Sequence, residues 1–250
     1  MLETVPTLQM SGRTDVGCAR DHNEDQIAWD ASAGLALLAD GMGGHNAGEV
    51  ASALAISILH PLLRDLPSDV LEQEVGMQNA VAEANSEILH KAASEAVFNG
   101  MGTTLALALF RGAGIMVGHV GDSRVYRLRG GRLELLTSDH SLLQELVAGG
   151  FMSAEEAAEA VNKNVITRAL GIEPTVEVEV HHHEVRVGDI YLLCSDGLND
   201  MVTDNTIAKI LIDNMDNLET AADALVAEAN RCGGNDNISA ILARVLALRE

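Results

Sequence analysis

Short apolar runs that end at glycine or aspartate alternate along the chain with longer stretches in which apolar residues recur every three or four positions. The runs rich in Val, Ile and Leu predict β-strands at Asp25–Trp29, Leu35–Ala39, Thr104–Phe110, Ile115–Val120, Val125–Leu128, Leu133–Leu136, Thr175–Val185, Ile190–Cys194 and Ile238–Val245. The longer stretches predict helices at Ala47–Leu63, Asp69–Val97, Leu142–Val147, Ala154–Val161, Thr206–Ile212 and Leu218–Asn230. Hairpin-like strands with two long helices among them indicate an α+β fold, in which sheets pack face to face beneath helices.

The connections between these elements indicate how the chain is organised. No Pro/Ser-rich linker, internal repeat or low-complexity tract interrupts residues 1–250, so we expect a single domain. The polar, helix-forming stretch from Asp139 to Arg168 breaks the run of strands, which predicts an inserted subdomain at about residues 139–170. Ser153 and Glu156 have the spacing of a capping box, which marks the start of a helix there.

Composition narrows the class of protein. Hydrophobic residues make up 47% of the 250 residues, enough for a sizeable core, but aromatic residues are only 2%. Ala, Leu, Val and Ile must therefore build most of that core. The net charge of −21 argues against a nucleic-acid partner, because binding to a phosphate backbone requires clustered Lys and Arg.

The cysteines and the N-terminal residues indicate the cellular compartment in which the protein is expected. The three cysteines form no CxxC pair, so they suggest neither a disulfide framework nor a zinc site. The N-terminus lacks a basic region followed by an apolar run, and no stretch approaches the roughly 18 uninterrupted apolar residues of a membrane span. We therefore expect a cytoplasmic protein with no membrane partner, and we expect a monomer.

The segment LALLADGMGGHNAGEV, Leu35 to Val50, runs from an apolar strand through a glycine-rich turn into the start of a helix. The turn carries Asp40, although phosphate-binding loops usually exclude acids. It matches neither GxxxxGK[ST] nor GxGxxG, and it has no lysine for a phosphate. A carboxylate and glycines beside a phosphate become compatible if a metal cation lies between them. Asp-Gly is also a common tight-turn dipeptide, so the segment alone leaves both interpretations open.

Further acids stand at the start or end of predicted strands: Glu24, Asp25, Asp122, Asp196 and Asp236. A rigid sheet could direct such side chains toward one point. Unpaired carboxylates repel one another, so they are tolerated together only around cations. Oxygen ligands without a His or Cys pattern select hard ions such as Mg²⁺ or Mn²⁺.

Six segments together carry a family resemblance: RTDVGCARDHNED, LLADGMGGHNAGE, GHVGDSRVYRL, NVITRALG, LLCSDGLND and GGNDNIS. In this order, the chain from about Ser11 to Val245 resembles the metal-dependent PPM-type (type 2C) Ser/Thr protein phosphatases, in their bacterial branch. The resemblance implies a four-layer α-β-β-α sandwich of two antiparallel sheets between helix pairs, with the inserted subdomain as a flap. It also implies hydrolysis of phosphoserine and phosphothreonine monoesters in proteins by a water that two metal ions activate, reversing a bacterial Ser/Thr kinase.

The resemblance assigns a metal site to four of the motif residues. It implies that Asp40 bridges two core ions, Mn²⁺ or Mg²⁺, and that the carbonyl of Gly41 helps to hold one of them. Asp196 and Asp236 would ligate the other ion. The acid in the glycine-rich turn is then explained, because the carboxylate of Asp40 would face metal and the metal would face the phosphate.

Other motif residues take supporting roles by the same resemblance. Asp25 and Glu24 would lie beside the two ions, mainly through bound waters. Arg20 stands where the family keeps its phosphate-binding arginine, whose guanidinium grips two phosphate oxygens; Arg13 is a weaker candidate for the same cleft. Asp122 would help to hold a third, weakly bound ion.

The chain departs from the family pattern in two places. Some eukaryotic relatives carry His directly after the Asp-Gly pair, where this chain has Met42, so the general acid stays open and His45 is assigned no catalytic role. A His-Pro pair is also missing ahead of NVITRALG, near Val161 and Asn162, which leaves the shape of the flap open.

Three other features have simpler explanations than a second site. Alternate strand residues point to opposite faces, so at most two of His181, His182 and His183 could share an ion, and we interpret them as a solvated edge strand. Ser195 lacks the GxSxG context of a serine nucleophile. The arginines of a predicted hairpin are interpreted as a solvated face rather than a contact for acidic phosphopeptides: Arg124, Arg127, Arg129 and Arg132.

Two other functions compete with a protein phosphatase. A pseudophosphatase would bind phosphoproteins or a kinase without catalysis, but such a protein is expected to have lost acids that this chain retains. A phosphatase of small phosphoesters would use the same residues, and the sequence does not distinguish it from a protein phosphatase.

Overall fold

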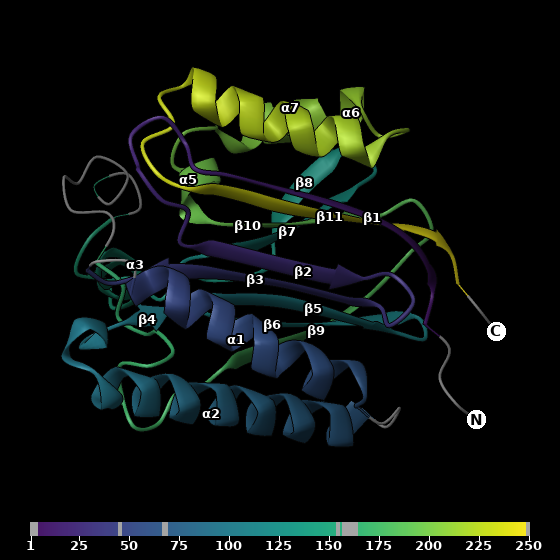
Figure 1. The fold of residues 1–250 in the computed structure, drawn as a ribbon. Helices are drawn as coiled ribbons and strands as arrows, with labels where there is room; N and C mark the ends of the chain where they lie inside the picture. The colour runs from purple at the N-terminus through teal and green to yellow at the C-terminus, as the bar shows by residue number, and fades with distance from the viewer. Residues whose placement is uncertain (1–4, 45–46, 67–69, 154–155, 157–164, 249–250) are drawn as a thin grey trace.

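The computed structural model describes residues 5–44, 47–66, 70–153, 156 and 165–248. Two antiparallel sheets lie face to face, and helices cover the outer face of each sheet, so that the chain forms four layers (Figure 1). This arrangement confirms the α-β-β-α sandwich that the resemblance implied.

The two sheets differ in strand order. The first sheet has the order β1 (Thr7–Asp15), β11 (Ile238–Ala247), β10 (Ile190–Cys194), β7 (Arg124–Arg129) and β8 (Arg132–Leu135). The second sheet has the order β2 (Asp25–Asp30), β3 (Leu35–Met42), β5 (Leu105–Arg111), β6 (Gly114–Val120) and β9 (Glu179–Glu184), and the short β4 (Gly102–Thr103) pairs with the end of β3. In both sheets, strands from distant parts of the chain become neighbours.

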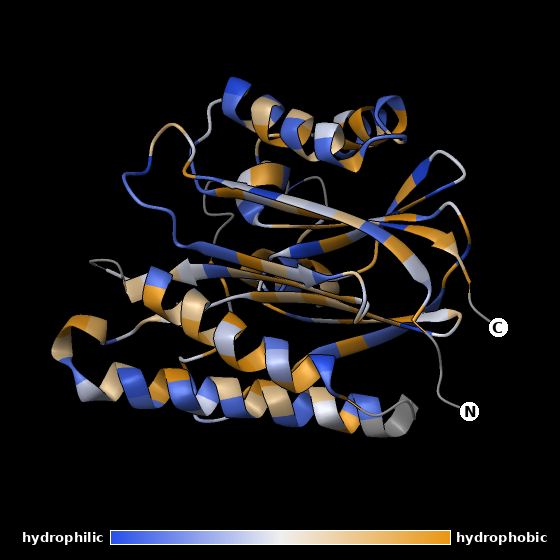
Figure 2. Cartoon of the chain, turned by 45° about the vertical axis from the view of Figure 1, so that its right-hand side comes forward, coloured by the Kyte–Doolittle hydropathy of each residue, from blue (hydrophilic) through white to orange (hydrophobic). Residues whose placement is uncertain are grey.

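Two main helices pack on each sheet. The second sheet is covered by α1 (Ala47–Arg64) and α2 (Val70–Ser94), and the first by α6 (Asp204–Asp213) and α7 (Leu218–Arg231). Shorter helices lie in the connections: η1 (Ala96–Phe98), α3 (Leu142–Ala148) and α5 (Asp196–Asn199). Hydrophilic and hydrophobic residues alternate along α1, α2 and α7 (Figure 2), as expected of helices with one face on a sheet. None of the helices in the described residues is long and apolar enough to cross a bilayer.

Three apolar clusters hold the four layers together. Strand alternation divides the side chains of β3 between two of them. Leu35 and Leu37 pack toward α1 and α2, whereas Leu38 enters the layer between the sheets. In that central layer, Phe110 and Tyr191 meet edge to face with their ring centroids 5.2 Å apart. The register of β3 is therefore fixed by burial on both of its faces.

Most predicted elements are present near their predicted positions, but four elements were not predicted as such: β1, β4, η1 and α5. Ser11 and Gly12 interrupt the apolar pattern of β1, and the reason lies in the neighbouring strand. A Cβ atom on Gly12 would lie 2.7 Å from the ring of Trp29. Gly12 therefore leaves room for the Trp29 side chain, and the apolar pattern that would predict β1 from the sequence is lost at this position.

The structure corrects two predicted boundaries. The end predicted for the strand at Leu35–Ala39 is wrong, because β4 pairs with Gly41 and Met42 and extends β3 past Asp40. The strand predicted at Thr175–Val185 is shorter, since only Glu179–Glu184 forms β9. The capping box is confirmed, because Ser153 N–H donates to Glu156 Oε2 and Glu156 N–H donates to Ser153 Oγ. Apart from Glu156, the helix predicted at Ala154–Val161 lies outside the described residues.

Replacement of Leu38 by alanine should lower the free energy of unfolding by about 2–5 kcal/mol, because it leaves a cavity between the two sheets. Leu246→Ala is the matched control, since Leu246 on β11 is 44% exposed, and it should cost less than about 1 kcal/mol. Urea unfolding of both variants measures the difference. Equal losses in the two variants would contradict the assignment of Leu38 to the central core.

Candidate active site

Four predicted acids meet where the two sheets end together. Asp25 and Asp40 are direct cross-strand partners on β2 and β3 of the second sheet. Asp196 follows β10 and Asp236 precedes β11 in the first sheet, and both line a pocket of about 220 Å³. A hydrogen bond connects the sheets at this point, because the Ser195 hydroxyl donates to Asp25 Oδ2 at 2.8 Å. The fold therefore places acids from four distant segments side by side.

The backbone of Asp40 is fixed by two threonines. Its N–H donates to Thr104 Oγ1 at 3.0 Å, and its carbonyl accepts from Thr104 N–H at 2.8 Å and from the Thr103 hydroxyl at 2.9 Å. The Thr104 hydroxyl also bonds to the Ser123 hydroxyl at 2.7 Å, directly after Asp122. Because both backbone polar groups of Asp40 are bonded, only its side chain is free to adjust.

Glycines allow the start of α1 to pack against the end of β3. A Cβ atom on Gly41 would lie 2.1 Å from the carbonyl oxygen of Gly48, and one on Gly48 would lie 2.8 Å from Glu24 Oε2. Gly41 N–H donates to the Glu24 carbonyl at 3.1 Å. Any larger residue at Gly41 would push the first turn of the helix away from the acids.

Asn237 joins the loop before β2 to the start of β11, a role that the sequence analysis missed. Its side-chain oxygen accepts from Glu24 N–H at 2.8 Å, and its amide group donates to the carbonyls of Val16 and His22 at 2.9 Å each. The same loop carries Arg20, whose Nη2 lies 2.7 Å from Asp236 Oδ2. The hydrogen bonds of Asn237 therefore hold the loop so that both Glu24 and Arg20 lie beside Asp236.

Burial and mutual repulsion make the carboxyl groups of Asp25, Asp40 and Asp196 hard to ionise. Burial raises the pKa of Asp25 to about 6. Burial, and then the charges of Asp25 and Asp196, raise the pKa of Asp40 well above its ordinary value. Burial, and then the charge of Asp122, also raise the pKa of Asp196. A positive charge among these groups would reverse this effect and restore the carboxylate forms.

The donor set fits hard divalent cations. Asp25 Oδ1 is buried and has no hydrogen-bond partner among the described residues, and the same is true of Asp122 Oδ1. Buried polar atoms are normally satisfied, so such orphaned oxygens indicate a missing partner. Both atoms are carboxylate oxygens, the type of ligand that Mg²⁺ and Mn²⁺ prefer. Asp25 and Asp122 could therefore each offer an oxygen to an ion at this end of the sandwich.

Asp122 lies at the end of β6, near the other acids but in a different setting. Burial, and then the charge of Asp139, raise its pKa to about 6. Its charge also acts on Asp196, which places the two carboxylates in the same electrostatic environment. Asp122 thus belongs to the acidic cluster, at its margin.

Arg13 and three of the four hairpin arginines, Arg124, Arg127 and Arg129, pair with carboxylates. The secondary assignment of Arg13 to the cleft is wrong, because Arg13 binds Glu219 and Asp223 on α7. Each of three hairpin arginines forms an ion pair with one carboxylate: Arg124 with Asp139, Arg127 with Glu134 and Arg129 with Asp189. These pairs argue against a contact for acidic phosphopeptides. The interpretation as a solvated face is also wrong for these three arginines, because their side chains are only 25%, 13% and 25% exposed.

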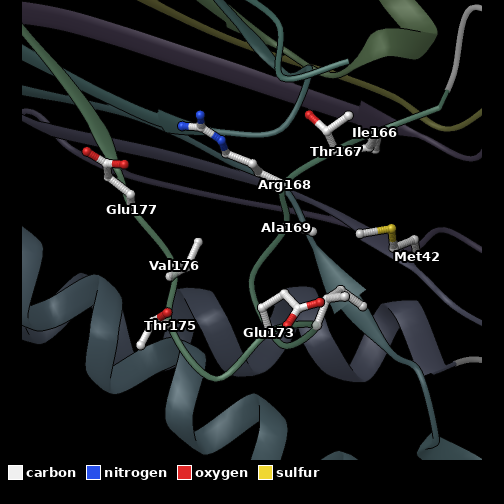
Figure 3. Close-up of a pocket in the computed structure, with 10 residues that line it drawn as sticks. Met42, Ile166, Thr167, Arg168, Ala169, Glu173, Thr175, Val176 and Glu177 are labelled. Carbon is white, nitrogen blue, oxygen red and sulfur yellow. The ribbon is translucent and has the colours of Figure 1, made fainter. Parts of the chain in front are cut away.

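A larger cavity of about 600 Å³ begins at Met42, two residues beyond Asp40 (Figure 3). Its remaining wall comes from one stretch of chain between β8 and β9: Ile166, Thr167, Arg168, Ala169, Ile172, Glu173, Thr175, Val176 and Glu177. Among the described residues that line this cavity, none belongs to the group of Asp25, Asp40, Asp196 and Asp236. His45, Val161 and Asn162, where the chain departs from the family pattern, lie outside the described residues.

Comparisons with known proteins agree with this geometry. The sequence profile described as Protein phosphatase 2C matches residues 19–242. The chain belongs to the protein phosphatase 2C family. It is 39% identical over 235 residues to the serine/threonine phosphatase stp of Listeria monocytogenes, and the match covers 92% of this chain and 93% of that relative. The resemblance inferred from six short segments is thereby confirmed.

Solved structures of this phosphatase family share the fold. The serine/threonine phosphatase Stp1 from Staphylococcus aureus superposes with a TM-score of 0.90 at 34% identity, covering 98% of both chains. The catalytic domain of the serine/threonine protein phosphatase PstP, solved in complex with two manganese ions, superposes with a TM-score of 0.85 at 42% identity. That match covers 96% of this chain and 98% of the PstP chain.

With a chelator present, the free energy of unfolding should fall as the pH rises from about 4 to about 7. The folded-state pKa of Asp25 and of Asp122 is about 6, against an ordinary value of 3.8, so the folded protein keeps protons that the unfolded chain has released. This stabilisation is complete below about pH 4 and is lost as the pH passes through about 6. It amounts to about 3 kcal/mol for each group.

Urea unfolding at several pH values measures this dependence. Asp40→Asn removes one of the repelling charges, so the free energy of unfolding of this variant should fall less than that of the wild type over the same pH range. A free energy of unfolding that rises from pH 4 to pH 7 would show that the acids are not destabilised in the folded chain.

Proposed function

We propose that this protein is a metal-dependent phosphatase that hydrolyses phosphoserine and phosphothreonine monoesters in proteins. The observation that carries the proposal is the meeting of Asp25 and Asp40 from one sheet with Asp196 and Asp236 from the other. Membership of the protein phosphatase 2C family and the identity to a serine/threonine phosphatase over most of the chain support it.

The acids and one backbone carbonyl would hold two core ions, Mn²⁺ or Mg²⁺: Asp25, Asp40, Gly41, Asp196 and Asp236. The all-oxygen donor set and the orphaned Asp25 Oδ1 fit such ions. The two manganese ions in the PstP catalytic domain support the same number here. Such ions, when bound, stabilise negative charge on the phosphoryl group. They also lower the pKa of water, so that hydroxide is available to attack phosphorus near neutral pH. Asp122 would share a third, weakly held ion with Asp196, and Glu24 would stay outside the direct ligands.

Arg20 would orient the phosphate. Its side chain is 51% exposed, and one of its nitrogens is held 2.7 Å from Asp236 Oδ2 at the edge of the acidic cluster. The remaining N–H groups of the guanidinium fork can bind two phosphate oxygens at once. Asp236 thus fixes the direction from which a phosphate monoester approaches.

Ser195 serves to position Asp25 and not as a nucleophile. The residue is fully buried, and its hydroxyl donates to Asp25 Oδ2 while accepting from Ser239 N–H at 3.0 Å. A substrate phosphorus atom has no path to this oxygen. Direct attack by water, without a covalent phosphoenzyme, is the reaction that the site supports.

The substrates and the substrate-binding surface are also part of the proposal. Substrates would be proteins phosphorylated by a cognate Ser/Thr kinase, and we propose that the chain acts as a monomer in the cytoplasm. The stretch at residues 139–170 would form a flap subdomain beside the acids within one domain. The cavity that begins at Met42 could then receive residues flanking the phosphorylated side chain.

Asp40→Asn should lower kcat for a phosphothreonine peptide by about 10²–10³-fold, the usual loss when one preorganised electrostatic group is removed. Phosphate release in the presence of Mn²⁺ measures it, and calorimetry follows Mn²⁺ binding. Asp213→Asn is the matched control, because Asp213 pairs with Lys209 on the surface of α6, and it should keep full activity. Undiminished turnover in Asp40→Asn would refute the bridging role.

Arg20→Ala should raise KM for the same peptide by roughly 10–100-fold, since a hydrogen bond to a charged group contributes about 1.5–3 kcal/mol. Arg13→Ala removes an arginine that pairs with α7, and it should leave KM unchanged. Steady-state kinetics on both variants separate KM from kcat. An unchanged KM in Arg20→Ala would exclude phosphate binding by this side chain.

A further inference from the structure

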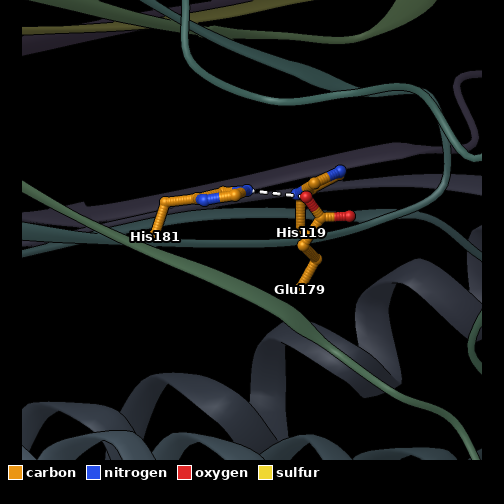
Figure 4. Close-up of side chains that lie close together, drawn as sticks. All are labelled: His119, Glu179 and His181. Carbon is orange, nitrogen blue, oxygen red and sulfur yellow. Dashed lines mark hydrogen bonds and ion pairs between the residues drawn. The ribbon is translucent and has the colours of Figure 1, made fainter.

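A second group of metal-ligand side chains lies at the outer edge of the second sheet. His119 on β6 is paired in register with Glu179 on β9, and His181 follows two residues later on the same face of β9. One ligand atom from each of the three side chains lies within 4.8 Å of the others. Figure 4 shows these three side chains converging. Among the described residues, this is the one group of three or more His, Cys, Asp and Glu side chains that is so compact.

His119 presents an unused nitrogen lone pair to this group. The residue is fully buried, and its Nε2 lies 2.8 Å from the carbonyl oxygen of Ser138. A carbonyl can only accept, so Nε2 carries the proton and Nδ1 carries the lone pair. Nδ1 is buried and has no hydrogen-bond partner among the described residues. A backbone carbonyl that fixes the tautomer of a histidine with one free nitrogen is the arrangement found around metal-binding histidines.

Glu179 is held in place by two histidines. Its Oε1 lies 2.6 Å from His181 Nε2, and its Oε2 lies 3.1 Å from His140 Nε2. His140 Nδ1 accepts from Gly121 N–H at 3.1 Å, so its Nε2 is the proton donor to Glu179. Both nitrogens of His140 are therefore occupied, and this residue supports the carboxylate without being available as a ligand itself. Its ring stacks on that of His119 with centroids 4.6 Å apart.

The protonation states suit a cation. Burial lowers the pKa of His119, which keeps its imidazole neutral. Burial opposes the ionisation of Glu179, but the hydrogen bonds from His140 and His181 outweigh it and lower the pKa of this carboxyl. A neutral imidazole and an ionised carboxylate are the forms in which these groups bind metal, and an ion bound through His181 Nε2 would displace to solvent the proton that this nitrogen donates to Glu179.

We propose that His119, Glu179 and His181 form a binding site for a borderline divalent ion of the Zn²⁺ class, separate from the acidic cluster. Two imidazoles and one carboxylate match a three-ligand zinc site with an open fourth position. The acidic cluster offers only oxygen ligands, which favour harder ions, so the two sites select different metals. An ion here would tie the edge strand β9 to β6, three residues before Asp122.

The experiment uses the full chain with excess Mg²⁺ to fill the acidic cluster. Zn²⁺ bound after dialysis is counted by elemental analysis, and Co²⁺ is then used as a visible probe, because four-coordinate Co²⁺ absorbs far more strongly than Co²⁺ in six-coordinate oxygen sites. The wild type should retain one Zn²⁺ per chain beyond any held by the acids and should show the strong Co²⁺ bands.

Two variants of neighbouring histidines decide the outcome. His181→Ala should lose the additional Zn²⁺ and the strong Co²⁺ bands, with an affinity at least about 100-fold weaker, since even outer partners of a metal ligand contribute 10–100-fold. His182→Ala is the matched control, because His182 lies on the opposite face of β9, against Glu74, and it should behave like the wild type. Both side chains are partly exposed, at 38% and 42%, so either variant should fold.

Equal Zn²⁺ content in the wild type and His181→Ala would overturn the proposal. Weak, octahedral-type Co²⁺ spectra in the wild type would also overturn it. Glu179→Gln, which keeps the shape of the side chain and removes its charge, provides a second variant, and it should weaken Zn²⁺ binding as well.

Discussion

The burial of like charges where the two sheets end together is the constraint on which the rest of this structure depends. Asp25 is only 6% exposed and lies directly opposite Asp40 on the neighbouring strand. An isolated buried carboxylate is costly, and several together are more so. The apolar layer between the sheets holds the strands in register against this repulsion, since each central strand is buried on both faces. The fold thus holds the acids close together before any ion arrives.

Neutral hydrogen-bonding side chains give this arrangement its precision. The Ser195 hydroxyl connects β10 of one sheet to Asp25 of the other, and Asn237 binds three backbone groups of the loop before β2. Thr104 fixes the backbone of Asp40 from the neighbouring chain segment. These residues carry no charge of their own, so they orient carboxylates without neutralising them. A site built in this way keeps its shape on rigid strands and its negative potential for cations.

The two clusters of ligand side chains illustrate how one sheet can offer different chemistry at different places. The acidic cluster lies where the ends of both sheets meet and contains only oxygen donors. The histidine cluster lies at the outer edge of the second sheet and depends on the alternation of β9. His181 and Glu179 share one face of that strand, whereas His182 points to the other face and contacts α2. The interpretation of β9 as an edge strand is confirmed, and the two-face rule also explains why one histidine of the run is excluded from the group.

The sequence by itself determined the type and approximate position of most strands and helices, because burial imposes a period of two on strands and of about 3.6 on helices. It also identified the acids, since charged residues at the ends of apolar runs are visible without a structure. It did not identify β1, because Gly12 is there to accommodate Trp29 from another strand. Only the tertiary structure decided that Asp40 lies within a strand, that Ser195 and Asn237 orient the acids, and that His119 meets Glu179 and His181. Each of these depends on hydrogen bonds or strand pairing between segments far apart in the chain, and a local pattern of residues carries no information about such partners.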